Sequence, residues 1–114
     1  MFPDAGDIAW VEFDPIRGTE QAGRRPALLI SGRAYHAVSP RAVVCPITRT
    51  ERPWPFDLAV PLTCLTRGFV LVDQVRTVDR PQRMFDLIET VSPGFLAEVR
   101  GRLAALLGIE MEQS

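Results

Sequence analysis

The spacing of short apolar runs between prolines and glycines is the feature that most limits what this chain can fold into. Runs of about four to eight residues with β-branched and aromatic side chains, bounded by turn-forming residues, are typical of strands. The chain is therefore predicted to be mainly β. We expect its strands near Asp7–Asp14, Pro26–Ser31, Ala42–Thr48, Phe56–Val60, Gly68–Asp79 and Met84–Val91.

Details within these runs refine the prediction. The unbroken apolar run PALLIS favours a strand that is buried on both faces. Pro46 lacks a backbone N–H, so we expect the end of its strand to lie at a sheet edge or to form a bulge. The polar residues Asp73 and Gln74 interrupt the run at Gly68–Asp79, and closely spaced prolines make Glu51–Pro55 an extended loop.

A convincing helical pattern stands at the end of the chain. Ser92 supplies a side-chain oxygen for an N-cap, Pro93 occupies the favoured first position, and Gly108 is a suitable stop. Six short strands and one helix predict a small curved sheet or partly open barrel that the helix closes on one side, built as a single domain over residues 1–114. The apolar stripe of the helix consists of Leu96, Val99, Leu103, Leu106 and Leu107.

Composition limits the class of protein. The chain has 114 residues, 46% of them hydrophobic and 24% charged, and no apolar run approaches the roughly 18 to 20 residues that span a bilayer. Its first segment, MFPDAGDIAW, carries acids where a signal peptide carries bases, so we expect a cytoplasmic protein. Cys45, Cys64 and the single His36 form no metal-ligand spacing, so we expect packed thiols and no metal or other cofactor.

The net charge of −1 hides a basic segment. Residues 17–52 hold seven arginines against Glu20 and Glu51, whereas residues 1–16 hold four acids and no base. All thirteen cationic side chains are arginines, whose planar fork suits phosphate recognition better than an ammonium group. The acidic total argues against a general nucleic-acid coat, but a face built from residues 17–52 can steer a phosphate chain.

Four segments in a fixed order carry a family resemblance. They are GDIAWVEFDP, GTEQAGRRPALLIS, CPIT and DQVRTVD, and an apolar helix follows them. In this order they resemble the MazF/PemK family of toxin endoribonucleases from bacterial toxin–antitoxin pairs, over nearly the whole chain. The resemblance implies an SH3-like barrel of the MazF/PemK/CcdB-like fold, a homodimer, and neutralisation by a cognate antitoxin protein. It also implies metal-independent cutting of single-stranded RNA, such as mRNA, at a short sequence.

The resemblance places Arg25 and Thr48 in the site. Cutting RNA by attack of its own 2′-hydroxyl leaves a 2′,3′-cyclic phosphate and a 5′-hydroxyl, and it needs a base, an acid and donors to the phosphoryl oxygens. Pro26 biases Arg25 towards an extended backbone at a strand end, where its guanidinium can stabilise charge or donate a proton. The Thr48 hydroxyl can donate to a phosphoryl oxygen. Since arginine is a poor proton acceptor, Asp73 and Glu20 are the candidates for the base.

Each of these residues also has a structural interpretation. Without the resemblance, an ion pair between Arg25 and either Glu20 or Asp73 would serve to hold the loop. Thr48 would be an ordinary β-branched residue at a strand end. His36 is suited to acid–base chemistry, but it lies in a segment for which we find no counterpart in the family, so we expect it outside the site.

Residues around this pair are expected to bind RNA. Glycines on both sides of residues 19–22 let the chain approach a sugar-phosphate backbone closely. Trp54 can stack on a base or pack at the rim of the core, and Gln74 and Arg76 can bind RNA or brace their strand. The expected RNA-binding residues are Thr19, Gln21, Arg24, Arg49, Trp54, Gln74 and Arg76.

Two departures from the family pattern leave other functions open. Leu71 stands where some members have an arginine, and Thr19 where some have a histidine. The alternatives are a non-catalytic poison of DNA gyrase, as in the CcdB-like relatives, and an RNA-binding module that does not cut. The presence of Arg25 and Thr48 together with Gly-x-Glu-Gln favours the nuclease. Mapping the new 5′ ends of a mixed-sequence RNA would separate the three.

Overall fold

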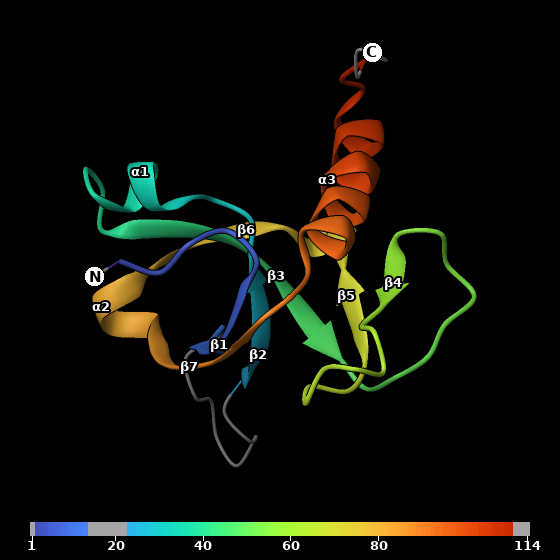
Figure 1. Ribbon diagram of the computed structural model, residues 1–114, viewed down its shortest axis with the longest axis horizontal. Coiled ribbons are helices and arrows are strands. Elements are labelled where there is room, and N and C mark those ends of the chain that lie inside the picture. The colour runs from blue at the N-terminus through green and yellow to red at the C-terminus, as the bar shows by residue number, and fades with distance from the viewer. Residues whose placement is uncertain (1, 14–22, 111–114) are drawn as a thin grey trace.

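A curved antiparallel sheet forms the body of the protein, and one long helix stands beside it (Figure 1). The structure is a computed structural model that describes residues 2–13 and 23–110. The strands are β1 (Asp7–Glu12), β2 (Arg24–Leu29), β3 (Arg41–Thr48), β4 (Asp57–Ala59), β5 (Phe69–Leu71), β6 (Arg76–Asp79) and β7 (Met84–Thr90). They lie in the order β4-β5-β3-β2-β1-β7, and β6 pairs with β3 as well.

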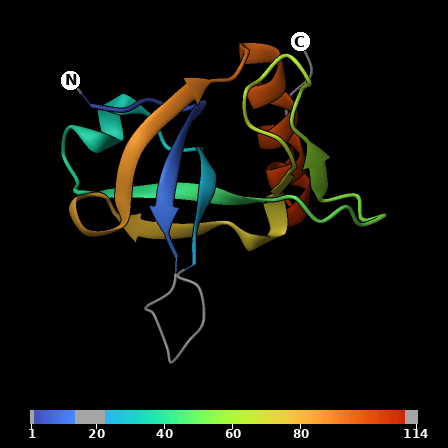
Figure 2. The ribbon, with the colours of Figure 1, turned by 90° about the horizontal axis from the view of Figure 1, so that it is seen from below.

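The long helix is α3 (Pro93–Leu107), and it begins and ends where the sequence predicts. The Ser92 hydroxyl accepts a hydrogen bond from the backbone N–H of Phe95 at 3.2 Å, and Gly108 ends the helix with a φ of 72°. Figure 2, seen from below, shows α3 at one side of the curved sheet. The shorter helical segments are α1 (Arg33–His36), the 3-10 turn η1 (Val72–Gln74) and α2 (Arg80–Arg83).

Alternating side chains give the sheet two buried faces. On β2, Leu28 belongs to the hydrophobic cluster that includes Phe95 and Val99 of α3, whereas Ala27 and Leu29 belong to a second cluster on the other face. All three strand residues are fully buried, as expected for the PALLIS run. The predicted architecture, mainly β with a C-terminal helix against one side of an open sheet, is confirmed.

Pro46 lies within the strand predicted over Ala42–Thr48 and not at its end. It lies inside β3, buried and opposite Ala27 of β2. On its other side β3 pairs with β6 as far as Val44 and with β5 from Ile47 onwards. Pro46 therefore stands where one partner strand has ended and the next has not begun, so its missing N–H costs no ladder bond there.

The predicted strand Gly68–Asp79 is in fact two strands. β5 ends at Leu71, and the polar residues Asp73 and Gln74 lie in η1 before β6 begins at Arg76. This turn carries the chain from pairing with one end of β3 to pairing with the other. The polar interruption in the sequence thus marks a change of position along β3.

His36 holds the N-terminal segment against the sheet. Its side chain is 1% exposed, and its Nδ1 lies 2.7 Å from the carbonyl oxygen of Pro3. Because a carbonyl only accepts, Nδ1 carries the proton; in the neutral ring Nε2 accepts from the Ser31 hydroxyl at 2.7 Å. The backbone N–H of Arg33 adds a bond of 2.9 Å to the Asp4 carboxylate. The polar atoms of the His36 ring are therefore used within the fold.

Candidate functional site

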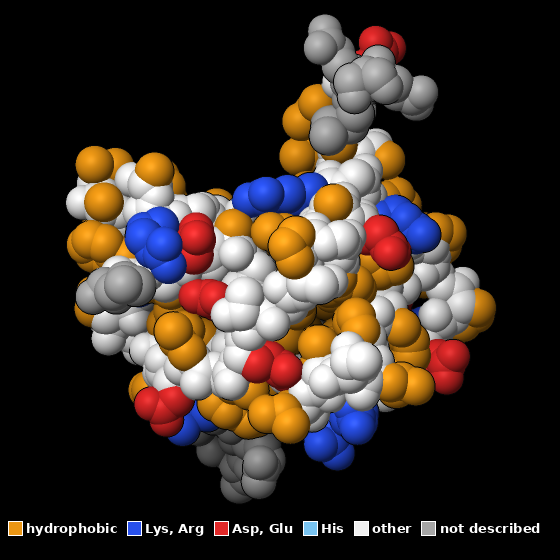
Figure 3. All heavy atoms as spheres, in the orientation of Figure 1, with side chains coloured by type: hydrophobic (Ala, Val, Ile, Leu, Met, Phe, Trp, Pro, Cys, Tyr) orange, Lys and Arg blue, Asp and Glu red, His pale blue; other side chains and the backbone are white. Residues whose placement is uncertain are grey.

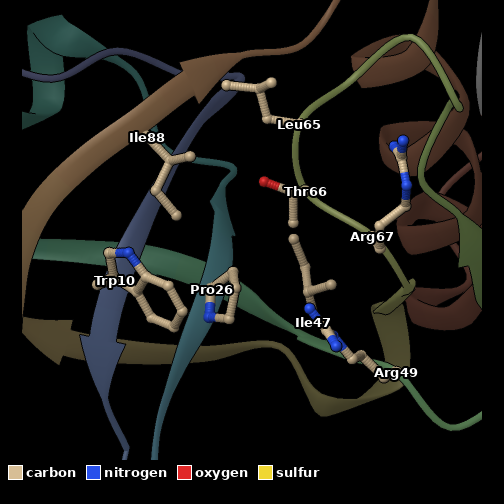
Figure 4. A pocket seen from close by; sticks show the side chains of 8 residues that line it. All are labelled: Trp10, Pro26, Ile47, Arg49, Leu65, Thr66, Arg67 and Ile88. Atoms are coloured by element: carbon tan, nitrogen blue, oxygen red, sulfur yellow. The ribbon is translucent and has the colours of Figure 1, made fainter.

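Two cavities lie on opposite faces of the sheet at the same ends of β2 and β3. Neighbouring residues of a strand point to opposite faces, so Arg25 and Pro26, and likewise Pro46 and Ile47, line different cavities. The arginine cavity, of about 280 Å³, is lined by Phe13, Arg25, Pro46, Gln74 and Arg76. The tryptophan cavity, of about 210 Å³, is lined by Trp10, Pro26, Ile47, Arg49, Leu65, Thr66, Arg67 and Ile88 (Figure 4).

The arginine cavity brings together three of the residues singled out in the sequence. Arg25 projects from the exposed end of β2, while Gln74 and Arg76 come from η1 and β6. The Arg76 guanidinium donates to the carbonyl oxygen of Phe13 at 3.3 Å and lies 5.4 Å from the centre of the Phe13 ring, so the end of β1 orients it. Two guanidinium groups and an amide around one cavity suit a phosphate group.

Thr48 lies beside this cavity rather than in its lining. It stands two residues after Pro46 on β3 and therefore on the same face of the strand. Its hydroxyl oxygen accepts a hydrogen bond from the backbone N–H of Thr50 at 3.2 Å, and its own O–H can still donate. Gly68 packs directly against the Thr48 backbone, because a Cβ at that position would lie 2.2 Å from the Thr48 carbonyl oxygen.

Asp73 is engaged by a residue that is distant in the sequence. The indole N–H of Trp54 donates to the Asp73 carboxylate at 2.8 Å, which joins η1 to the loop between β3 and β4. The Asp73 charge also reaches the core, since burial and that negative charge raise the pKa of the Cys45 thiol to about 12. Cys45 is therefore a protonated, packed thiol at neutral pH, as the sequence suggests.

The other predicted RNA-binding residues are distributed more widely. The Arg24 guanidinium lies 3.9 Å from the centre of the Phe85 ring, and its Nε is 3.9 Å from the Glu12 carboxylate, on the opposite side of β2 from Arg25. Arg49 lines the tryptophan cavity. The predicted residues Thr19, Glu20 and Gln21 lie outside the described residues.

The tryptophan cavity is mainly apolar and is bounded by an anchored loop, residues 61–67. Figure 4 shows the side chains of Trp10, Ile47 and Ile88 gathered around the hollow. Glu89 accepts hydrogen bonds from the backbone N–H groups of Leu65 and Thr66 at 2.9 and 2.7 Å, and from the Thr66 hydroxyl at 2.6 Å. The carboxylate therefore ties the loop to β7.

The pKa of Glu89 reflects this anchoring. Partial burial raises the pKa of the Glu89 carboxyl. The hydrogen bonds from the Thr66 hydroxyl and the two backbone N–H groups, together with the charge of Arg67, lower it by more than burial raises it. The pKa therefore lies below its ordinary value of 4.5. The charge of Glu89 in turn adds to the effect of burial in raising the pKa of Cys64.

Sequence reasoning missed several residues that shape the site. Arg52 binds Asp57 through two hydrogen bonds of 2.7 and 2.9 Å, and the Asp57 side chain is fully buried. Arg52 and Asp57 lie on either side of Trp54 in the chain. The closely spaced prolines around Trp54 were the one sequence feature that marked this segment as a structured loop. Glu89 and Gly68 carried no local signal, because their partners lie in other elements of the fold.

The residues that the structure describes include no group of three or more His, Cys, Asp or Glu side chains arranged to hold a metal ion. Within the same part of the chain, no helix is long and apolar enough to cross a membrane.

Comparison with known proteins gives one consistent family. Residues 4–107 match the family described as the PemK-like, MazF-like toxin of type II toxin-antitoxin systems. The endoribonuclease toxin MazF of Escherichia coli strain K12 is 36% identical over 107 residues, which cover 93% of this chain and 95% of that protein. The endoribonuclease PemK of Escherichia coli is 34% identical over 108 residues, which cover 91% and 81% of the two chains.

Solved structures agree with the sequence relatives. The crystal structure of MazF from Deinococcus radiodurans superposes with a TM-score of 0.84 at 40% identity, covering 94% of this chain and 97% of that one. The MazE-MazF structure (Form-II) from the same organism superposes with a TM-score of 0.86 at 39% identity, covering 95% and 97%.

Proposed function

Because the chain belongs to the PemK-like, MazF-like toxins of type II toxin-antitoxin systems, we propose that it cuts single-stranded RNA at a short sequence by attack of the RNA's own 2′-hydroxyl. The family resemblance noted in the sequence is confirmed, and with it the class of enzyme, an endoribonuclease toxin. The chemistry of cleavage and the roles of single residues are the proposal. The expected products are a 2′,3′-cyclic phosphate and a 5′-hydroxyl.

The observation that carries this proposal is the arginine cavity beside Thr48. The Arg25 guanidinium would stabilise the charge that grows on the phosphoryl oxygens and would donate the proton to the leaving 5′-oxygen. The Thr48 hydroxyl would donate to a second phosphoryl oxygen. Gln74 and Arg76 would hold the RNA backbone in the same cavity. Since guanidinium groups supply the positive charge, the reaction would need no metal ion.

The general base comes from a carboxylate in this proposal. Arginine holds its proton too strongly to accept another group's proton at neutral pH, so the candidates are Asp73 and Glu20. Asp73 is adjacent to Gln74 of the arginine cavity, and its carboxylate accepts the Trp54 indole N–H.

The test is a cleavage reaction on a mixed-sequence RNA in the presence of EDTA. We expect cutting to continue, and the products to carry a 2′,3′-cyclic phosphate and a 5′-hydroxyl. An RNA with a 2′-deoxy sugar at the cut site should bind but resist cleavage, because it lacks the nucleophile. Efficient cutting of that substrate would contradict the proposed chemistry. Binding without any cutting would instead identify an RNA-binding module.

A cognate antitoxin is the second part of the proposal, and one of the similar solved structures is that of MazE-MazF from Deinococcus radiodurans. An extended acidic segment with apolar side chains would cover Arg25 and Thr48 and reach over to the tryptophan cavity. That cavity fits such a segment, because its walls are apolar and Arg49 stands at its edge. Added salt should weaken RNA binding more steeply than antitoxin binding, since RNA binding releases counterions and the antitoxin also buries apolar surface. An antitoxin that bound without displacing RNA would contradict this arrangement.

We further propose that the toxin is a homodimer that acts in the cytoplasm, where mRNA is found. An exposed apolar end on α3 supports the dimer, and Figure 3 shows apolar side chains along this projecting end. Leu107 and Ile109 are 59% and 55% exposed there. Sedimentation at micromolar concentration tests the dimer, and a monomer would contradict it.

A further inference from the structure

The hydrogen bond between Trp54 and Asp73 links the loop after β3 to the wall of the arginine cavity. The two residues are 19 positions apart, and the indole N–H donates to the carboxylate at 2.8 Å. Asp73 precedes Gln74, whose side chain lines the cavity. Trp54 follows Thr48 by six positions, in the loop that leaves β3. The tryptophan is thereby fastened beside the place proposed for the phosphate.

The Trp54 backbone is fixed as firmly as its ring. Its N–H donates to the carbonyl oxygen of Arg52 at 2.8 Å, and its carbonyl oxygen accepts from Asp57 at 3.0 Å. The double hydrogen bond between Arg52 and the buried Asp57 carboxylate closes this turn. Phe56 supports the ring from one side, with the ring centres 5.8 Å apart and the planes tilted by 52°. A ring held in this way loses little conformational freedom when a ligand binds it.

The part of Trp54 that remains free is a ring surface. The core does not need this side chain, since Trp54 is 47% exposed. The indole N–H, which is the side chain's only donor, is already occupied by Asp73. An aromatic surface without a free donor recognises a nucleobase by stacking, because every base has a π-face. The ligand that suits it is an unpaired base, and a neighbouring phosphate would lie in the arginine cavity.

We propose that Asp73 is a positioning residue, which holds the Trp54 ring ready to stack on an RNA base next to the cleaved phosphate. The inference rests on the proposed RNA substrate and sharpens it. The carboxylate acts through Trp54 and does not take the proton of the 2′-hydroxyl.

Five variants separate a positioning role from a base role. Asp73→Asn keeps an oxygen that accepts the indole N–H but cannot act as a base, so we expect its KM to rise less than that of Asp73→Ala and its pH profile of cleavage to keep the wild-type shape. Asp73→Ala and Trp54→Phe each break the hydrogen bond, so each should raise KM severalfold at an almost unchanged kcat. The double variant Asp73→Ala/Trp54→Phe should be no worse than either single variant. Trp54→Ala removes the ring and should weaken binding by about tenfold or more.

Binding is measured separately on an RNA that carries a 2′-deoxy sugar at the cut site, by fluorescence anisotropy. This readout does not depend on cutting, so a protein that failed to cut RNA would refute the proposed function and would still allow a test of the stacking residue. Tyr35→Ala is the matched control, because Tyr35 is an aromatic residue of similar exposure, 41%, on α1. Thermal unfolding of each variant shows that it is folded.

Two results would overturn the inference. A loss of about a hundredfold in kcat for Asp73→Asn, with Trp54→Phe unaffected, would make Asp73 the base. Unchanged binding of the 2′-deoxy RNA in folded Trp54→Ala would remove the stacking role. A tenfold loss of binding in Trp54→Ala, shared in part by Asp73→Ala and absent from Tyr35→Ala, would support it.

Discussion

The packing of Gly68 against β3 predicts one of the largest effects of a single methyl group in this protein. A Cβ at this position would lie 2.2 Å from the carbonyl oxygen of Thr48, closer than real Cβ atoms come, and 3.0 Å from its carbonyl carbon. The obstacle is backbone, which cannot rotate aside, and φ at Gly68 is +132°, a value that side-chain-bearing residues rarely adopt. Gly68→Ala therefore combines backbone strain of about 1–3 kcal/mol with overpacking of about 1–3 kcal/mol, so we expect roughly 4 kcal/mol of destabilisation.

Urea unfolding at neutral pH measures this loss, and RNA cleavage well below the unfolding midpoint measures its effect on the site. Since Thr48 pairs with Phe69, relief of the clash must shift the end of β3 and lower the rate of cutting. Gly101→Ala is the matched control, because nothing lies within 4 Å of its Cβ position inside α3, and it should stabilise the protein by about 0.5–1 kcal/mol. A Gly68→Ala protein within about 0.5 kcal/mol of wild type, with normal cleavage, would refute the reasoning.

Three other perturbations test the site and its supports. Arg25→Ala should lower the rate of RNA cleavage by about 10²- to 10³-fold in a folded protein, which is the scale of losing one oxyanion-hole donor. Arg25→Lys should not restore the rate, because an ammonium group cannot replace the guanidinium fork. A normal rate in Arg25→Ala would show that the residue has only a structural role. The pKa of Glu89 is lowered from 4.5, so its anchoring of the 61–67 loop is complete above about pH 4.5 and is lost as the pH falls further. The urea stabilities of wild type and Glu89→Gln should therefore differ at neutral pH and converge in acid, whereas a constant difference would contradict the anchoring. Asp57→Asn should lower the thermal unfolding midpoint and weaken RNA binding in anisotropy titrations, because Arg52 loses its charged partner beside Trp54. Unchanged unfolding and binding in this variant would show that the Arg52–Asp57 pair does not support the loop that holds Trp54.

Features encoded within a few residues were predictable from the sequence. The Ser92 cap, Pro93 and Gly108 define α3 because each acts on its own neighbours along the chain. The apolar run PALLIS predicts a strand buried on both faces for the same reason. The order of the short motifs was enough to identify the family and the expected positions of Arg25 and Thr48.

Features that depend on pairing between distant segments were not predictable. The position of Pro46 is acceptable only because β6 and β5 meet β3 on either side of it, and no property of the CPIT segment reveals that arrangement. The contact between Trp54 and Asp73 spans 19 positions, and the one between Thr66 and Glu89 spans 23. Sequence patterns report the preference of each residue, but they do not report which partner the fold brings to it.

The alternation of side chains on β2 and β3 determines how ligands can share the site. Arg25 and Pro26 are neighbours in the chain yet line cavities on opposite faces of the sheet, so a small ligand in one cavity leaves the other empty. The two faces meet at the end of β3. There Thr48 lies on the face of the arginine cavity, and Arg49, the next residue, lines the tryptophan cavity on the other face. An extended peptide advances about 3.3 Å per residue, so a few residues crossing this edge would contact both cavities. If the proposed function holds, RNA cleavage would take place on one face and an antitoxin segment would bind the apolar cavity on the other, so a substitution in one cavity need not disturb the other.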